Sequence, residues 1–294
     1  MQEQTRHLFG FGMPKCGTTT VATMLSAHPA ICMHSQKEPG DFLRENPRFR
    51  MSGYTTTDQS RWIADFTTSY GLTGNRARFF RGLRSAGIQP DSARYVLCLR
   101  DPADLARSYM NHMAERRGLY IATAMDGVRA EILSACDFDG AVADLEREID
   151  PDHVFIVRFE DLHGKDRQRQ LSSALFDWLD LPPLESDAVI WENVQGKSGR
   201  YPAFLDPLAC LLRRTNLVRN LSPDSRARVR KTFSRTQESP PVPTELVDET
   251  LAWLEAQDPV LRSRALLSRV ATGRLSRPEN RALAAHYRAR DIDD

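Results

Sequence analysis

Residues 7–27 place a loop containing glycine and lysine between a short apolar run and a stretch with helical periodicity. The run at 7–12 (HLFGFG) ends in glycine, and 18–27 (TTTVATMLSA) continues as an expected helix. At a strand-to-helix junction of this kind, unpaired backbone N–H groups and the helix dipole create an anion site. The sequence therefore predicts a buried strand that leads into an anion-binding loop.

The strand-then-helix pattern recurs further along the chain. Apolar runs at 94–100 (RYVLCLR) and 153–159 (HVFIVRF) are typical of strands buried on both faces of a parallel sheet. Helices are expected at 102–117, with Asp101 as N-cap and Pro102 as first residue, and at 165–179. Repeated units of this kind predict an α/β fold with a central parallel sheet flanked by helices.

The proline-rich stretch at 239–243 divides the chain of 294 residues. Proline cannot continue a helix, and helical spacing resumes at 244–256 and beyond 258. We expect a main domain at 1–238 and a C-terminal helical extension at 239–294, whose role is open.

The composition and the distribution of apolar residues, cysteines and histidines argue against a membrane, secreted or metal-binding protein. The net charge of +1 carries no information about partners, and no apolar window or leader-like N-terminus predicts a membrane span or secretion. We therefore expect a cytoplasmic protein. Five dispersed cysteines predict reduced thiols, and dispersed histidines predict no metal site.

The loop differs from the phosphate loop of nucleoside triphosphatases. That pattern needs lysine directly after its second glycine, whereas here Thr18 follows Gly17 and the lysine is Lys15. Cys16 has no assignable base partner, so we do not interpret it as a nucleophile. A P-loop kinase or other nucleotide-binding protein remains an alternative interpretation.

Residues 14–19 (PKCGTT) resemble the 5′-phosphosulfate loop of sulfotransferases that use 3′-phosphoadenosine 5′-phosphosulfate (PAPS). The resemblance implies a P-loop-NTPase-like sulfotransferase fold and PAPS as co-substrate, with no metal required. It implies that the loop binds PAPS through Pro14, Lys15, Cys16, Gly17, Thr18, Thr19 and Thr20.

Arg100 ends an expected strand, and Ser108 follows eight residues later in the next helix. The same family shows an arginine and a serine at this spacing, which implies that both bind the 3′-phosphate of PAPS. A guanidinium fork suits a phosphate, and a serine hydroxyl adds a neutral donor.

Residues 196–202 (GKSGRYP) are similar to a loop over the 3′-phosphate and adenine in the carbohydrate-type branch, although one residue and the flanking cysteines are missing. By that resemblance Lys197, Gly199 and Arg200 contribute to PAPS binding.

Sulfuryl transfer needs a base for the acceptor proton and a cation for charge on the leaving oxygen. Lys15 is the expected cation. The segment 37–42 (KEPGDF) resembles the KEPxxF segment of the carbohydrate-type branch, which implies Glu38 as base. His34 is the second candidate and Asp41 the third. Residues 62–70 resemble a further segment of that branch, so Asp65 and Tyr70 are expected near the acceptor.

The acceptor is open, and a small molecule, glycan or lipid hydroxyl or amine all fit. A non-enzymatic alternative is nucleic-acid binding through the arginine-rich stretch 213–235, which a solvated helix face explains more simply. We therefore expect no nucleic-acid partner.

Overall fold

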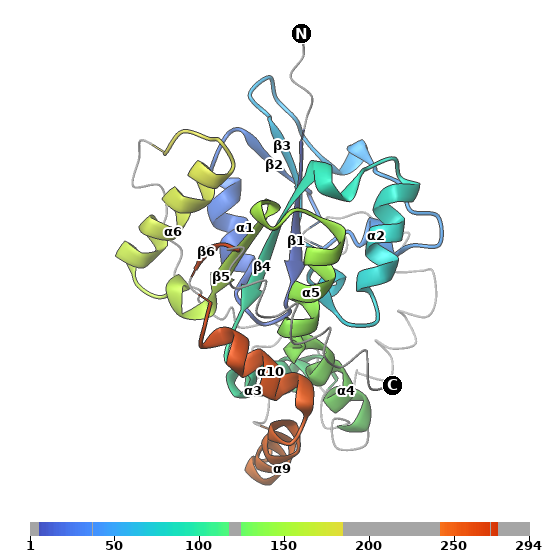
Figure 1. Cartoon of the computed structure of the whole chain (residues 1–294), viewed down its shortest axis with the longest axis vertical. Coiled ribbons are helices and arrows are strands. Elements are labelled where there is room, and N and C mark those ends of the chain that lie inside the picture. Colours follow the sequence, from blue (N-terminus) through green and yellow to red (C-terminus); the bar gives the residue numbers. More distant parts are fainter. Residues whose placement is uncertain (1–5, 37, 118–124, 185–241, 271, 276–294) are drawn as a thin grey trace, which may run out of the picture.

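The computed structural model describes residues 6–36, 38–117, 125–184, 242–270 and 272–275. A six-stranded sheet with the order β2-β3-β1-β4-β5-β6 forms its centre (Figure 1). The strands are β1 (Arg6–Gly12), β2 (Ile31–Met33), β3 (Trp62–Asp65), β4 (Ala93–Leu99), β5 (Val154–Arg158) and β6 (Gly273–Arg274). The first five pair in parallel, and β6 runs antiparallel to β5. The α/β fold predicted from the sequence is confirmed, with one antiparallel edge strand that the sequence did not predict.

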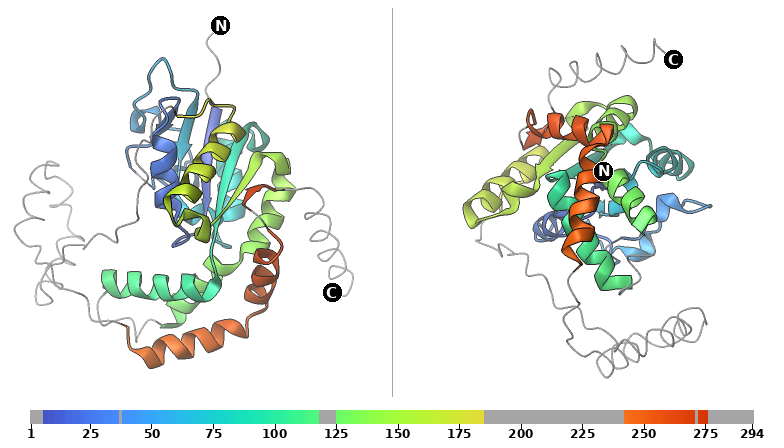
Figure 2. Two further views of the ribbon diagram at one scale, coloured as in Figure 1. Left: turned by 90° about the vertical axis from the view of Figure 1, so that its left-hand side faces the viewer. Right: turned by 90° about the horizontal axis from the view of Figure 1, so that it is seen from below.

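Helices cover both faces of the sheet. On one face lie α1 (Thr18–Ser26) and α6 (Lys165–Trp178), and on the other lie α2 (Arg76–Ser85) and α5 (Phe138–Glu148), as Figure 2 shows from a second direction. Further helices, near the carboxyl ends of the strands, are α3 (Pro102–Arg117), α4 (Met125–Cys136), α9 (Thr244–Glu255) and α10 (Asp258–Leu267). Parallel strands are joined by crossovers that include helices, because the end of one strand and the start of the next lie at opposite ends of the sheet.

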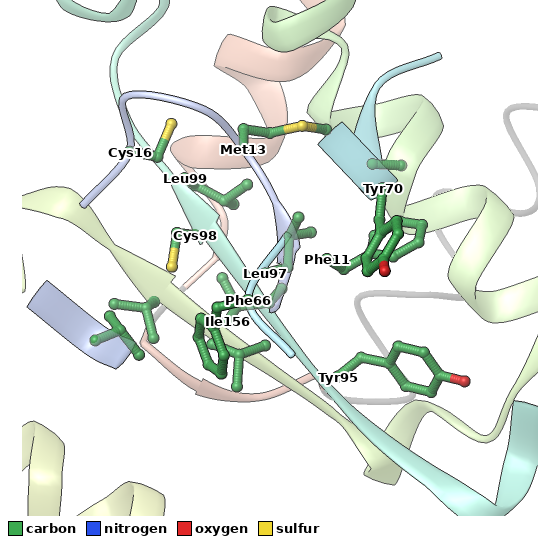
Figure 3. Packing of buried hydrophobic residues seen from close by; sticks show 14 of the residues in the cluster. Phe11, Met13, Cys16, Phe66, Tyr70, Tyr95, Leu97, Cys98, Leu99 and Ile156 are labelled. Carbon is green, nitrogen blue, oxygen red and sulfur yellow. The ribbon is translucent and has the colours of Figure 1, made fainter. Parts of the chain in front are cut away.

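The core lies between the sheet and these helices. β4 is buried at all but one of its residues, as expected for a central strand covered on both faces. Figure 3 shows Phe11 and Met13 beside Leu97 and Leu99 of β4, so apolar packing continues from β1 into the loop that follows it. The loop therefore starts from a rigid base.

The C-terminal helices contact the rest of the molecule. Ser263 of α10 accepts hydrogen bonds from the backbone N–H groups of Phe138 (2.9 Å) and Asp139 (3.3 Å) at the start of α5. After α10, β6 joins the sheet beside β5. The domain boundary expected between residues 238 and 239 lies outside the described residues and stays a prediction.

The predicted helices and strands agree with the structure to within one or two residues. Asp101 accepts hydrogen bonds from the N–H groups of Ala103 and Asp104, which is the predicted N-cap geometry. No helix in the described part of the chain is both long enough and apolar enough to cross a membrane.

Candidate active site

The predicted anion loop joins β1 to α1 at the carboxyl end of the sheet. Gly17 precedes the first residue of α1, has a φ of 85° and carries no side chain to cap the helix. No acidic residue lies in the first turn of α1. The N–H groups at the start of the helix and the positive end of its dipole therefore suit a negatively charged ligand.

Glycine is required at position 17 for two reasons. Its φ lies in the left-handed region, where a side chain is unfavourable. In addition, a Cβ atom there would lie 2.2 Å from Cδ1 of Leu162 and 3.1 Å from Cδ2 of Phe159. Both residues belong to the 3₁₀ turn Phe159–Leu162 after β5, so this turn supports the loop from one side.

Arg100 connects the second predicted motif to this loop. It follows the last residue of β4, and its Nη1 donates a hydrogen bond of 3.2 Å to the carbonyl oxygen of Lys15. Its Cζ lies 3.9 Å from the centroid of the Phe159 ring. The two predicted phosphate-binding motifs, 85 residues apart in the sequence, therefore meet in space.

One polar atom of Arg100 is left without a protein partner among the described residues. Its Nε is buried and has no hydrogen-bond partner within the described residues. A buried guanidinium N–H without a partner is costly, and an anion bound beside it would remove that cost. The arrangement therefore fits a phosphate at this position.

Ser108 lies half-buried on α3, and Thr19 is exposed, whereas Thr18 and Thr20 are buried. Among the described residues, no hydrogen bond joins the side chains of Ser108 and Arg100. The structure thus brings Lys15, Gly17 and Arg100 together, while the role of Ser108 stays a prediction.

Phe159 is a site residue that the sequence reasoning missed. It is half-buried, stacks on Arg100 and faces Gly17. The only signal in the sequence was an aromatic residue at the end of a predicted strand, directly after Arg158. A cation over an aromatic face is held by about 0.5–2 kcal/mol, depending on how dry the site is.

Cys16 lies in the loop but points into the core. Its side chain is fully buried beneath the loop near Cys98 (Figure 3). Burial raises the pKa of the Cys16 thiol well above its ordinary range. A thiol of this kind is unreactive, and the structure agrees with the interpretation that Cys16 is no nucleophile.

The two candidate bases follow β2. His34 donates its backbone N–H to the carbonyl oxygen of Ala64 on β3 (3.1 Å), and its Nδ1 lies 2.9 Å from the carbonyl oxygen of Gln36. Its ring also meets Tyr54 edge-on. Glu38 is exposed, and the next residue, Pro39, is buried.

The third candidate, Asp41, is buried and pairs with Arg44 at 3.0 Å. A carboxylate held in this way has little access to an acceptor. Arg44 also donates to the carbonyl oxygen of Pro39 (3.1 Å), which ties down the segment that carries Glu38.

Asp65 ends β3 and is buried, with only 1% of its surface exposed. Burial raises the pKa of Asp65 to about 6, while hydrogen bonds from Thr67 and Tyr70 and the charge of His34 act in the opposite direction. The hydrogen bond from the backbone N–H of His34 to the carbonyl oxygen of Ala64 places the ends of β2 and β3 side by side.

Several predicted residues lie outside the described residues. They are Lys197, Gly199 and Arg200, together with Lys37 and the arginine-rich stretch 213–235. Within the residues that are described, no group of three or more His, Cys, Asp and Glu side chains is arranged to hold a metal ion.

Comparison with known families identifies the class. A family model described as the sulfotransferase domain matches residues 5–186, which is more than half of the chain. The chain belongs to this sulfotransferase family. Membership implies an enzyme that uses PAPS as the sulfuryl donor.

One solved structure supports the same fold, and two others are further similar chains. The sulfotransferase from Alicyclobacillus acidocaldarius is 18% identical, with 71% of this chain and 92% of that chain covered and a TM-score of 0.50. A sulfotransferase domain of the curacin biosynthetic pathway is 15% identical (87% and 99% covered, TM-score 0.44), and one of the Synechococcus olefin synthase is 17% identical (80% and 95% covered, TM-score 0.41). No curated protein matches the sequence significantly.

Proposed function

We propose that this chain transfers the sulfuryl group of PAPS to a hydroxyl or amine, with the two motifs that meet at Lys15 and Arg100 holding the donor. The loop 14–20 binds the 5′-phosphosulfate, and Arg100 and Ser108 bind the 3′-phosphate. The observation that carries this proposal is the hydrogen bond from Arg100 to the carbonyl oxygen of Lys15, beside the unpartnered Nε of the same guanidinium.

Different residues of this chain have different roles in the transfer. PAPS, when bound, supplies an activated sulfuryl group on a phosphate leaving group. The ammonium of Lys15 offsets the negative charge that develops on the leaving oxygen, and the start of α1 contributes its N–H groups. A base then removes the proton of the acceptor.

Glu38 is the proposed base, with His34 as the second candidate. The exposure of Glu38 supports this choice, because a base must reach an acceptor that arrives from solvent. Asp65 does not suit this role, since it is buried and both of its carboxylate oxygens already accept hydrogen bonds.

The acceptor is proposed to belong to the class that the carbohydrate-type branch uses, a hydroxyl or amine of a sugar, with lipid and natural-product hydroxyls as the other candidates. The resemblance of residues 37–42 to that branch motivates this choice. Incubation with radiolabelled PAPS and separate pools of sugars, lipids and phenols would identify the labelled class. Labelling confined to phenols would contradict the assignment to that branch.

A ligand-dependent thermal shift tests the donor site. PAPS and adenosine 3′,5′-bisphosphate should raise the melting temperature, and AMP, which lacks the 3′-phosphate, should raise it much less. A ligand at 100 times its Kd stabilises the folded state by about 2.7 kcal/mol. Arg100→Ala should remove the difference between bisphosphate and AMP, whereas Arg107→Ala, an exposed arginine on α3, should preserve it. Equal shifts for AMP and bisphosphate with the unmodified protein would refute the 3′-phosphate site.

A further inference from the structure

Asp65 is fully engaged by neighbouring donors. Its Oδ1 accepts the backbone N–H of Thr67 (3.0 Å) and the hydroxyl of Thr67 (2.6 Å), and its Oδ2 accepts the hydroxyl of Tyr70 (2.6 Å). A carboxyl group this deeply buried normally needs such donors to remain in the fold. Asp65 therefore acts on its neighbours and does not itself reach an acceptor.

The hydroxyl of Thr67 has a fixed direction. A hydroxyl carries one hydrogen, and that hydrogen is given to Asp65. Its lone pairs remain, and one of them accepts the backbone N–H of Gly40 at 3.0 Å. Asp65 thus orients Thr67, and Thr67 in turn holds the backbone at Gly40.

Gly40 lies two residues after Glu38 and bends the chain. Its φ of 62° lies in the left-handed region that favours glycine. On its other side the chain is anchored by Phe42, whose buried ring lies 5.4 Å from that of Phe9 and 6.2 Å from that of Tyr70. The backbone that carries Glu38 is consequently attached to the end of β3 and to the aromatic core.

We propose that Asp65 and Thr67 are positioning residues for sulfuryl transfer, which fix the backbone of residues 38–40 and so hold Glu38 at the acceptor. This role rests on the proposed function, in which Glu38 is the base. Asp65 and Thr67, at the end of β3, would then support catalysis without contacting the substrate.

A matched pair of variants at Thr67 tests the role. Thr67→Val keeps the shape but cannot accept the Gly40 N–H, whereas Thr67→Ser keeps the hydroxyl. The first measurement is hydrogen exchange at the Gly40 amide, followed by NMR. The second is PAPS turnover, followed as release of adenosine 3′,5′-bisphosphate with the acceptor pools present, together with the Kd of the bisphosphate.

We expect Thr67→Val to speed Gly40 exchange and to lower turnover, each by about twofold to tenfold, the range for loss of one hydrogen bond. The Kd of the bisphosphate should stay within about twofold of the unmodified value, and Thr67→Ser should restore both exchange and turnover. Tyr70→Phe is the control for exchange, because it removes another donor to Asp65 but leaves the Thr67–Gly40 hydrogen bond in place.

Two outcomes would overturn the positioning role alone, and a third would overturn the proposed function. If Thr67→Val and Thr67→Ser have the same exchange rate at the Gly40 amide and the same turnover as each other, the positioning role is overturned. An equal loss of turnover in both variants would also overturn it, because packing and not the hydroxyl would then be responsible. If the unmodified protein neither binds the bisphosphate nor turns over PAPS, the proposed function itself fails.

Discussion

Lys15 combines an unusual backbone conformation with the chemistry proposed for its side chain. Its φ is 65°, which is uncommon for a residue other than glycine, and its carbonyl oxygen accepts the hydrogen bond from Arg100. Such conformations persist where the surrounding structure holds them. Arg100 therefore contributes to the shape of the loop as well as to its charge.

Removal of the Lys15 ammonium should affect turnover more than binding. We expect Lys15→Ala to lower kcat by about 10² or more, because one donor to developing negative charge is lost in the transition state. The melting temperature without ligand should change little. Steady-state kinetics with the labelled acceptor class measures the effect, and activity within threefold of the unmodified enzyme would remove Lys15 from the mechanism.

The choice between Glu38 and His34 is a second prediction at this scale. Glu38→Gln keeps the size of the side chain but removes the base, so turnover should fall by about 10² to 10⁴ while the Kd of the bisphosphate stays the same. His34→Ala should produce the smaller loss of turnover.

The pH profile gives an independent measurement. A glutamate base gives a rate that is flat near neutral pH, whereas a histidine base gives a rate that rises around a pKa of about 6.5. Near-normal turnover in Glu38→Gln together with an inactive His34→Ala would reverse the assignment and leave the PAPS site intact.

At the scale of helices and strands, the sequence predicted those elements whose local signals are strong. The strands at 7–12 and 94–100 are continuous apolar runs, and α3 begins with a complete cap at Asp101 and Pro102. The three-residue β2 and the polar helix α2 were not predicted. Gly82 shows why α2 was difficult: a Cβ there would lie 2.1 Å from the carbonyl oxygen of Phe42, a tertiary contact with no local signal.

The residues of the candidate site also divide into those with a local sequence signal and those without one. Lys15, Gly17 and Arg100 could be predicted because each follows a recognisable strand. The hydrogen bonds that join Asp65, Thr67 and Gly40 could not, since they depend on how β3 and the segment after β2 lie side by side. Phe159 was missed because its partner, Arg100, comes from another strand.

Glu146 on α5 should make stability depend on pH. Burial, with a further contribution from Asp139, raises the pKa of Glu146 from about 4.5 to about 7. A raised carboxyl pKa means that the folded state binds the proton more strongly than the unfolded state, so the free energy of unfolding should fall as pH rises between these values. Glu146→Gln should lessen that fall and be the more stable protein above pH 7. Urea denaturation at several pH values measures the free energy of unfolding of both proteins. If that free energy depends on pH in the same way in Glu146→Gln as in the unmodified protein, the prediction is contradicted.

On the scale of the whole molecule, α10 is joined by hydrogen bonds to the start of α5, which covers one face of the sheet. Two N–H groups at the start of α5 find their acceptor in Ser263, a fully buried side chain of α10. Helix starts leave such donors without partners inside the helix. The start of α5 is therefore completed by a residue more than a hundred positions later.

Ser263→Ala should lower the free energy of unfolding by about 1–3 kcal/mol, because two buried N–H groups lose their acceptor. The exposed Ser268, whose hydroxyl bonds within its own turn among the described residues, is the matched control, and Ser268→Ala should change stability by less than about 0.5 kcal/mol. Denaturation in urea compares the two. Equal effects would show that the Ser263 hydroxyl contributes nothing beyond a surface serine.

The position of β6 has a consequence for the order of events during synthesis. Arg158 at the end of β5 contacts Thr272, which directly precedes β6 and lies 114 residues later in the chain. At roughly 5–20 residues per second, the ribosome needs about 6 to 23 s to make that interval. During this time the outer edge of β5 has no β6 to pair with, and an exposed strand edge is a site of aggregation. The newly made chain should therefore be most prone to aggregation after residue 158 leaves the ribosome and before residue 274 does.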